Sequence, residues 1–192
     1  FKIITVPQKY PRDVLKSKKK LKIGFDPKLH NEKQLKFLFD AKNITLKAIN
    51  KNLIDVIWLK KPKDLIKPFF SLLKKDAGEG SQEKIKKIKN VLLKKKVDYL
   101  FVTAPENVAW ILNIRGFDSA YSPIPNARLL INNNGNMDLF SNINKIKNIK
   151  KDFDKKINFY DENKIEKVLK KLWKKNIWLA NLSCSIYYRN LP

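Results

Sequence analysis

Few residues of this chain are of the types that carry out chemistry in enzyme sites. The 192 residues include one cysteine, Cys184, and one histidine, His30. A single cysteine forms no internal disulfide and cannot supply the paired spacing of a zinc site. A catalytic thiolate needs a nearby histidine, and His30 lies far from Cys184 in the sequence. We therefore interpret Cys184 as a buried structural thiol, which fits a reducing compartment.

His30 and Asp26 are the first candidates for metal ligands or acid–base groups. They stand in the segments G-F-D-P (24–27) and L-H (29–30), directly ahead of a predicted helix. A two-metal site needs several carboxylates and usually a histidine within a few ångström of one another. We expect His30 instead to be a hydrogen-bonded residue that fixes the turn at Asp26 and Pro27. We likewise expect Asp26 to be a turn or capping carboxylate and no acid catalyst.

Arg115 is the most distinctive charged residue, because only four of the 42 basic residues are arginines. The planar guanidinium binds carboxylates in a bidentate geometry that lysine does not reproduce. Arg115 follows a predicted buried helix, precedes Gly116 and has Asp118 within local reach. Two interpretations stay open. One is an internal ion pair that shapes the loop, which we favour, and the other is a clamp on a substrate carboxylate.

The formal net charge of +24 raises a nucleic-acid hypothesis, because lysine and arginine release counterions from phosphates when they bind. Nearly all the basic residues are lysines scattered over almost every segment, whereas base and phosphate recognition favours arginine. We interpret the charge as a solvated lysine-rich surface and expect no specific nucleic-acid partner. A stand-alone basic binding module for nucleic acid or acidic surfaces is the alternative hypothesis.

The first part of the chain alternates short apolar strands with a helix, which is typical of α/β folds. We predict strands at Lys2–Val6 and Leu21–Phe25 and a helix at Asn31–Lys42. The apolar run Leu53–Trp58 is too short for a helix of its own, and we expect it to close this unit. Prolines and glycines then interrupt the pattern, so we place a linker at 60–80.

The second part shows stronger signals. Ser81 is the predicted N-cap of a helix over Gln82–Lys95, with Glu83 in its first turn. Thr103 and Glu106 have the spacing of a capping box that opens another helix. The remaining predicted elements are a strand at Tyr99–Val102, a hairpin of Arg128–Ile131 and Met137–Phe140 with a type I′ turn at Asn134-Gly135, a helix carrying Ile165, Val168, Leu169, Leu172 and Trp173, and a strand at Ile177–Leu179.

Four segments in order carry a resemblance to a known family. They are G-F-D-P-x-L-H (24–30), N-L-I-D-V-I-W (52–58), A-G-E-G-S-x-E-K (77–84) and A-W-I-L-N-I-R-G-x-D (109–118). Together they resemble the N-terminal domains of aminopeptidase P, the Xaa-Pro aminopeptidases, which are similar to creatinase and prolidase. The resemblance implies an α/β fold of creatinase N-terminal-like mixed β-sheets with flanking helices, in two consecutive related units.

The resemblance also implies a domain plan. Residues 1–59 would be the C-terminal part of the first creatinase-like domain, and 81–192 the second, truncated one. The pita-bread catalytic domain would be absent. An incomplete first unit should leave an open sheet edge near Lys2–Val6 or Leu21–Phe25, which is an association hazard.

Relatives of this kind hydrolyse the bond between an N-terminal residue and a following proline, using two metal ions, usually manganese, held by the catalytic domain. The resemblance therefore implies no metal and no other cofactor in this segment, and no peptidase activity of the segment alone. It implies a homodimer whose partners are its own catalytic domain and peptides with proline in second position, and the single cysteine fits a cytoplasmic location. No stretch approaches the about 20 apolar residues of a membrane helix, so we expect no membrane partner.

For the site, the resemblance leaves a substrate-side role open for Arg115, Asp118 and Tyr121. The N-terminal domains of the family form part of the active-site rim and of the dimer interface. Tyr121 stands where relatives often have histidine, so this chain departs from the family pattern at that position.

Overall fold

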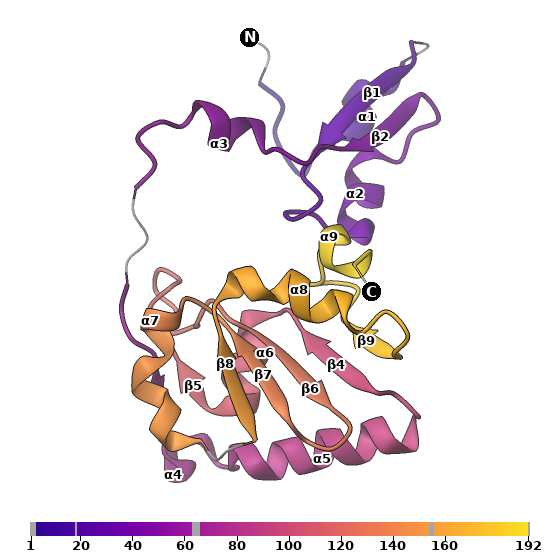
Figure 1. The fold of residues 1–192 in the computed structure, drawn as a ribbon. Helices are drawn as coiled ribbons and strands as arrows, with labels where there is room; N and C mark the ends of the chain where they lie inside the picture. The colour runs from indigo at the N-terminus through magenta and orange to yellow at the C-terminus, as the bar shows by residue number, and fades with distance from the viewer. Residues whose placement is uncertain (1–2, 18, 63–65, 154–155, 192) are drawn as a thin grey trace. The chain divides into compact units, whose positions relative to one another are not determined.

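The computed structural model describes residues 3–17, 19–62, 66–153 and 156–191 (Figure 1). The chain forms two compact units. The first comprises Phe1–Pro62 with Ser185–Asn190, and the second comprises Lys63–Cys184 with Leu191–Pro192. Each unit is built on its own sheet, and we describe the larger second unit first.

The second unit is built on a five-stranded sheet of mixed direction with the order β8-β7-β6-β4-β9. The central strands β4 (Tyr99–Val102), β6 (Arg128–Asn132) and β7 (Met137–Phe140) are antiparallel neighbours. The outer strands β8 (Ile157–Tyr160) and β9 (Ile177–Leu179) each run parallel to their neighbour. The predicted strands at 99–102, 128–131, 137–140 and 177–179 are confirmed, whereas β8 was not predicted.

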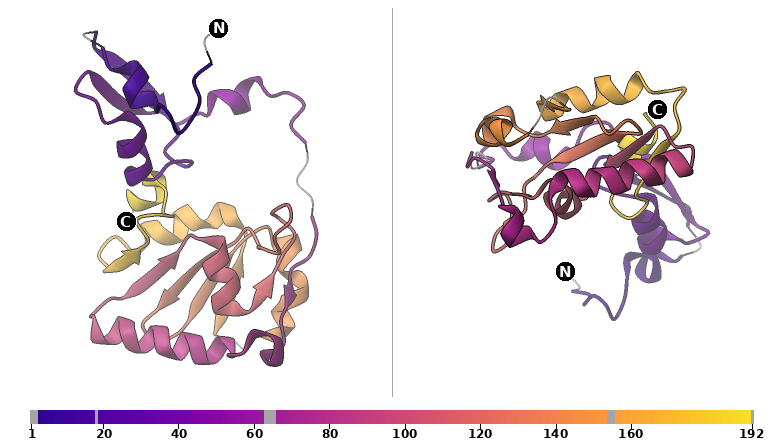
Figure 2. Two further views of the ribbon diagram at one scale, coloured as in Figure 1. Left: turned by 180° about the vertical axis from the view of Figure 1, so that it is seen from behind. Right: turned by 90° about the horizontal axis from the view of Figure 1, so that it is seen from below.

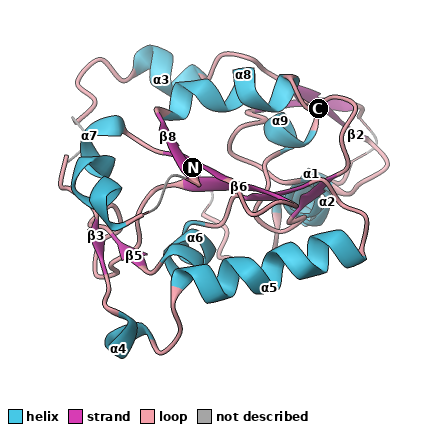
Figure 3. Ribbon diagram, turned by 60° about the horizontal axis from the view of Figure 1, so that its bottom comes forward, coloured by secondary structure: helices cyan, strands magenta, loops and turns pink. Residues whose placement is uncertain are grey.

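Helices cover both faces of this sheet. α5 (Ser81–Lys94) and α6 (Pro105–Leu112) lie on one face, and α8 (Ile165–Lys170) lies on the other (Figure 2, Figure 3). Successive residues of a strand point to opposite faces, so Leu129 and Ile131 pack under α5 and α6 while Leu130 faces α8; all three are buried. A strand buried on both faces reads as a continuous apolar run, which explains why β6 was recognisable.

The starts of α5 and α6 differ from the predicted caps. Gly80 is the N-cap of α5, and the Glu83 carboxylate accepts the Gly80 backbone N–H at 2.9 Å, so Ser81 is the first helical residue. Ala104 precedes α6 and makes no side-chain cap bond. The Thr103 hydroxyl instead pairs with the Ser183 hydroxyl at 2.8 Å. The capping box predicted for Thr103 and Glu106 is therefore wrong, because a tertiary partner competes for the Thr103 side chain.

The predicted β6–β7 hairpin is confirmed, but its turn is not type I′. That turn needs positive φ at both central residues, and only Gly135, at φ 88°, is positive in this turn. The Gly135 N–H donates to the Asn132 carbonyl at 2.9 Å, and the Asn132 side chain accepts the N–H groups of Asn134 and Asn136. The Asn132 side chain thus stabilises a longer loop with one glycine in the left-handed region.

The helix predicted from Ile165 to Trp173 is shorter than its apolar period. α8 ends at Lys170, and Ile165 and Leu169 are buried, but Trp173 is 67% exposed. The apolar spacing continues into the turn after Lys170, where Leu172 is partly buried and Trp173 is mostly exposed.

The remaining elements of the second unit are small. The segment predicted as a linker contributes β3 (Phe70–Ser71), which pairs antiparallel with β5 (Ile114–Arg115). It also contains α4 (Lys74–Ala77). The other short elements are α7 (Ile143–Ile146), η1 (Lys147–Asp152) and η2 (Glu162–Lys164).

The first unit holds a two-stranded parallel sheet of β1 (Leu21–Phe25) and β2 (Ile44–Ala48). The helices are α1 (Pro11–Leu15), α2 (Glu32–Phe39), α3 (Leu53–Ile57) and α9 (Ile186–Arg189). The strand at Leu21–Phe25 is confirmed. The strand predicted at Lys2–Val6 is wrong for residues 3–6, which are irregular, while residues 1–2 lie outside the described ranges.

Side-chain caps decide the helices of this unit. The Asn31 side chain accepts the Gln34 N–H at 2.7 Å and starts α2, which ends at Phe39 and not at Lys42. The Asn52 side chain accepts the N–H groups of Ile54 and Asp55. This cap allows 53–57 to form a helix, so the prediction that the run is too short for one is wrong.

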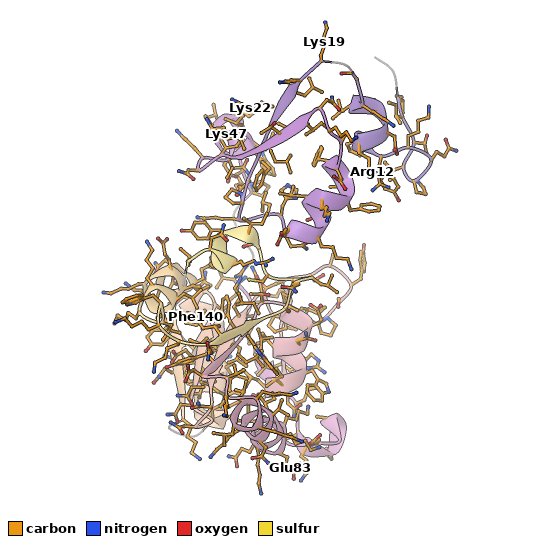
Figure 4. The ribbon with its side chains drawn as sticks, turned by 90° about the vertical axis from the view of Figure 1, so that its right-hand side faces the viewer. Arg12, Lys19, Lys22, Lys47, Glu83 and Phe140 are labelled. Atoms are coloured by element: carbon orange, nitrogen blue, oxygen red, sulfur yellow. The ribbon has the colours of Figure 1, made fainter. Side chains whose placement is uncertain are left out.

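Charged side chains line one face of the small sheet. Strand register and exposure place Lys22 and Lys47 on the same exposed face, and both project away from the ribbon (Figure 4).

No helix among the described residues is long and apolar enough to cross a membrane.

Candidate functional site

Two of the four recognised segments meet inside the second unit. Lys84 of α5 is buried, with 2% of its surface exposed. The Lys84 Nζ donates to the Trp110 carbonyl at 2.7 Å and to the Asn113 Oδ1 at 2.6 Å. It also lies 4.3 Å from the centre of the Trp110 ring. The buried ammonium group of Lys84 thus joins the segments 77–84 and 109–118 through polar and aromatic contacts.

Asn113 is the centre of this buried network. It ends α6 in the left-handed conformation, with φ 55° and ψ 36°, which asparagine tolerates better than most residues. The Asn113 Nδ2 donates to the Glu79 carbonyl at 2.8 Å, and the Asn113 carbonyl accepts the Leu72 N–H at 2.7 Å. One residue therefore terminates a helix and ties it to two other segments.

Burial lowers the pKa of Lys84, and the neighbouring charge of Arg115 lowers it further, while Glu79 raises it. Removing an ammonium group from water is costly unless its protons are bonded. The carbonyl and amide acceptors supply those bonds. The sequence analysis did not single out Lys84 as a buried, bonded cation. The one feature of the sequence that pointed to it was its position in the recognised segment 77–84.

Arg115 does not form the predicted local ion pair with Asp118. Its Nη1 donates to the carbonyls of Ala109 at 3.1 Å and of Ile114 at 2.9 Å. Asp118 pairs instead with Lys145, and its Oδ2 accepts the Asn126 N–H at 2.6 Å. The side chains of Lys145 and Asp118 are only 9% and 11% exposed, so this pair is well shielded from solvent.

The loop after β5 is folded back on itself. A Cβ atom at Gly116 would lie 2.8 Å from the Pro125 Cα and 2.9 Å from the Phe69 ring, so only glycine fits there. The Gly116 N–H donates to the Pro123 carbonyl at 3.2 Å. Together with the Asp118 contacts, this bond fixes the loop over 116–126.

The three predicted site residues have different environments. Arg115 is half-buried and bonded to backbone, and the Asp118 carboxylate is shielded inside the loop base. Tyr121 lies at the loop tip, fully exposed and with φ 60°. Phe117, 50% exposed, accompanies it on the surface. No described contact brings Arg115, Asp118 and Tyr121 together as one site.

The other two recognised segments meet in the first unit. The Asp26 carboxylate accepts the Lys28 N–H at 2.8 Å and the Asn52 Nδ2 at 2.8 Å. The Asn52 amide is thereby held where its oxygen caps α3. Asp26 is a turn carboxylate, as predicted. His30 Nδ1 lies 3.3 Å from the Gln34 Oε1, so its ring contacts α2 and not the Asp26 side chain.

Within the described ranges, no three His, Cys, Asp or Glu side chains come together in a way that could hold a metal ion. Cys184 is a buried cysteine outside any disulfide, as predicted.

The layered mixed sheet, with helices on both faces and recognised segments used as internal ties, defines an α/β domain of the creatinase N-terminal type. The family model for the creatinase/prolidase N-terminal domain matches residues 60–191. The chain therefore belongs to this family, which confirms both the predicted fold class and the predicted resemblance.

Relatives and a solved structure agree with this assignment. A probable Xaa-Pro aminopeptidase P of Coprinopsis cinerea is 32% identical over 149 residues, which cover 74% of this chain and 24% of the relative. One of Pyricularia oryzae is 34% identical over 107 residues, covering 53% and 17%. The crystal structure of X-prolyl aminopeptidase from Caenorhabditis elegans, described as a cytosolic enzyme with a di-nuclear active site, superposes with a TM-score of 0.69 at 24% identity, covering 84% of this chain and 27% of that one. The chain thus spans about a quarter or less of the length of these proteins.

Proposed function

We propose that the chain is a non-catalytic N-terminal segment of an Xaa-Pro aminopeptidase, a hydrolase that removes the N-terminal residue ahead of a proline. Two observations carry the proposal. The chain belongs to the family, and the polar side chains of its recognised segments are engaged with each other, Lys84 with Asn113 and Asp26 with Asn52. Side chains held in such internal bonds build a scaffold and are not free to attack a peptide.

In this proposal, residues 1–59 are the C-terminal part of a first creatinase-like domain, and 81–192 are a second one. The chemistry resides in a catalytic domain outside the 192 residues, where two metal ions, which we propose to be manganese, would activate water. Asp26 and Asp118 do not fit a ligand set, because they are bound to backbone N–H groups and to the Asn52 and Lys145 side chains.

The loop over 116–126 is the part of this segment that we propose to face the entrance of the active site. Its base is fixed by Asp118 and Gly116, so its tip can hold Tyr121 in one place without support from the catalytic domain. Arg115 lies under the loop as a positioning residue. A fixed aromatic tip at an entrance restricts access to short, unfolded peptides with proline in second position.

We also propose a homodimer in the cytoplasm, with the catalytic domain of the same polypeptide as the main partner. The cytosolic relative from C. elegans supports the location.

The test compares the 192-residue chain with the complete parent protein on an Xaa-Pro peptide in the presence of manganese. We expect turnover by the parent and none by the chain. Clear metal-dependent turnover by the chain alone would overturn the assignment of the chemistry to another domain.

The alternative hypothesis of a stand-alone basic binding module is not favoured. Several lysines are engaged internally or in ion pairs, including the buried Lys84 and Lys145 and the exposed pairs of Lys74 with Glu83 and Lys87 with Glu79. The alternative predicts tight, selective nucleic-acid binding with a steep salt dependence, which a titration at two salt concentrations measures.

A further inference from the structure

A cavity of about 240 Å³ opens in the second unit where the parallel strands β4 and β9 end. Figure 1 shows these two strands side by side. Thr103 and Ala104 follow β4 directly, Ala180 follows β9 directly, and all three line the cavity. Ligands of open α/β sheets bind outside the carboxyl ends of the parallel strands. The proposed function assigns no role to this place in the fold.

The walls of the cavity are mainly apolar. Ile88 of α5 and Ile111 of α6 line it from the helices, and Leu100 and Val102 line it from β4. Ile111 and Val102 are buried members of the core cluster, and Ile88 and Leu100 pack against that cluster. The volume lies below the range of drug-sized sites, roughly 300 to 1,000 Å³. A ligand for this cavity must therefore be compact, with one ring or one branched aliphatic group as its body.

Trp110 brings an indole ring to the lining. The side chain is 55% exposed, yet its position is constrained by the buried network. The Lys84 Nζ lies 4.3 Å from the ring centre and donates to the Trp110 carbonyl at 2.7 Å. A ring that is already held in place loses little freedom when a ligand packs on it, so less binding energy is spent on ordering it.

The polar groups of the cavity retain hydrogen-bonding capacity. The Thr103 and Ser183 hydroxyls lie 2.8 Å apart, and no other bond to either hydroxyl occurs among the described residues. Two hydroxyls carry two hydrogens, and the bond between them uses one, so the second hydrogen can be donated to a ligand. The Asn107 side chain also lines the cavity and has no hydrogen-bond partner within the described ranges. Its amide can both donate and accept.

None of the described residues in the lining carries a charge. An ionised ligand in this apolar space would lose its hydration without gaining a charged partner, which is costly. A neutral ligand that accepts one hydrogen bond and donates another matches the hydroxyl pair and the Asn107 amide.

We propose that this cavity is a binding site for a small neutral carboxamide carried on a compact aromatic or branched aliphatic body. The carbonyl oxygen of the ligand accepts the spare hydroxyl hydrogen of the Thr103–Ser183 pair, and its N–H group donates to the Asn107 side chain. The body rests on Ile88 and Ile111 and against the Trp110 ring.

The test is a titration of the 192-residue chain, followed by NMR shifts of the Ala104 and Asn107 amides and of the Trp110 indole N–H. Three probes separate the contributions: benzamide, benzoate of the same shape but charged, and acetamide with the head group but no ring. We expect benzamide to bind saturably and at least about tenfold tighter than either of the others. Benzoate that binds as tightly at these positions would overturn the neutral ligand class, and acetamide that binds as tightly would overturn the role of the apolar walls.

A matched pair of variants tests the location. Asn107→Ala should weaken benzamide binding about fivefold, the effect of losing one neutral hydrogen bond. Asn90→Ala removes the same side chain from an exposed position of α5 outside the described lining, and should change the affinity less than about twofold. Both positions are exposed, so neither variant should impair folding. Equal effects of the two variants, or no saturable binding of benzamide, would overturn the proposal.

Discussion

The two units share the alternation of strand and helix but differ in what their sheets bury. In the second unit the central strands are covered on both faces, and Leu129, Leu130 and Ile131 are each at most 2% exposed. In the first unit, Leu35 is the one buried side chain among the described large hydrophobic residues. Parallel sheets are stable only when both faces are covered, and two strands alone are marginal. The same alternation of strand and helix thus forms a well-buried hydrophobic core in the second unit and leaves most apolar side chains of the first unit partly or fully exposed.

The exposed segment from α3 onward shows the same contrast. Leu53, Ile57 and Leu59 are 63%, 72% and 91% exposed. Its cap is well formed, so the local signals are satisfied while the packing is not. We infer that a helix of this chain can be capped without its apolar side chains being packed in a core.

The largest expected effect comes from a matched truncation in both sheets. Leu129→Ala in β6 removes a fully buried side chain and should lower the free energy of unfolding of the second unit by about 2 to 5 kcal/mol. Leu46→Ala in β2 removes the same atoms from a partly buried site and should cost about 1 kcal/mol. Urea denaturation of both variants measures the difference. Equal losses would show that the first unit has a core of its own.

The buried network of the second unit gives the next largest effect. Lys84→Met keeps the apolar stem but leaves the Trp110 carbonyl and the Asn113 Oδ1 without their donor, so we expect a loss of about 2 kcal/mol. Lys87→Met on the same helix breaks only an exposed pair with Glu79 and should change stability by less than about 0.5 kcal/mol. Thermal unfolding of the two variants compares them, and a harmless Lys84→Met would contradict the structural role of the network.

Asp138 in β7 provides a smaller, pH-dependent effect. Desolvation by burial raises its pKa, against a hydrogen bond from Asn158 that lowers it. Because the folded pKa exceeds the unfolded one, the penalty is fully present above the folded pKa. It disappears as the pH falls through the folded pKa and below the unfolded one.

Asp138→Asn should therefore stabilise the second unit at neutral pH by a few tenths of a kcal/mol to about 1 kcal/mol, given the partial solvent screening of this half-buried site. The difference from the parent chain should vanish toward about pH 4. Denaturation at a series of pH values checks this, and a stability difference that grows on acidification would have the wrong sign.

The smallest effect on stability is expected at Tyr121. Tyr121→Ala in the 192-residue chain should change the free energy of unfolding by less than about 0.5 kcal/mol, because the side chain contacts solvent. In the complete parent protein of the proposed function, the same variant should change KM for Xaa-Pro peptides more than kcat. Val91→Ala on α5, also exposed, is the control. An unchanged KM would remove Tyr121 from the proposed entrance.

Self-association of the first unit also remains a prediction. β1 pairs only with β2 in the described sheet, which leaves an unpaired strand edge of the kind that promotes aggregation. Sedimentation of the chain over a range of concentrations measures it, and a monomer throughout would contradict it.

Local signals predicted much of the second unit because its elements agree with its packing. The apolar runs at Tyr99–Val102 and Ile177–Leu179 became strands, and Val108, Ile111 and Leu112 became the buried face of α6. The wrong predictions concern polar side chains that could bond either a local or a distant partner. Thr103 bonds Ser183 rather than its own helix, and Asn52 makes a helix of a run that seemed too short.

For the candidate site, the sequence by itself determined the family and the segments that matter, since four motifs in a fixed order define an aminopeptidase P-type N-terminal region. Only the tertiary structure decided which partners those residues take. Arg115 and Asp118 are close in sequence, yet Asp118 pairs with Lys145, and Lys84 rather than Arg115 is the buried cation of the network. The physical reason is that a charge takes the partner that its burial and geometry allow, and both are set by the packing of α5, α6 and α7 around the sheet.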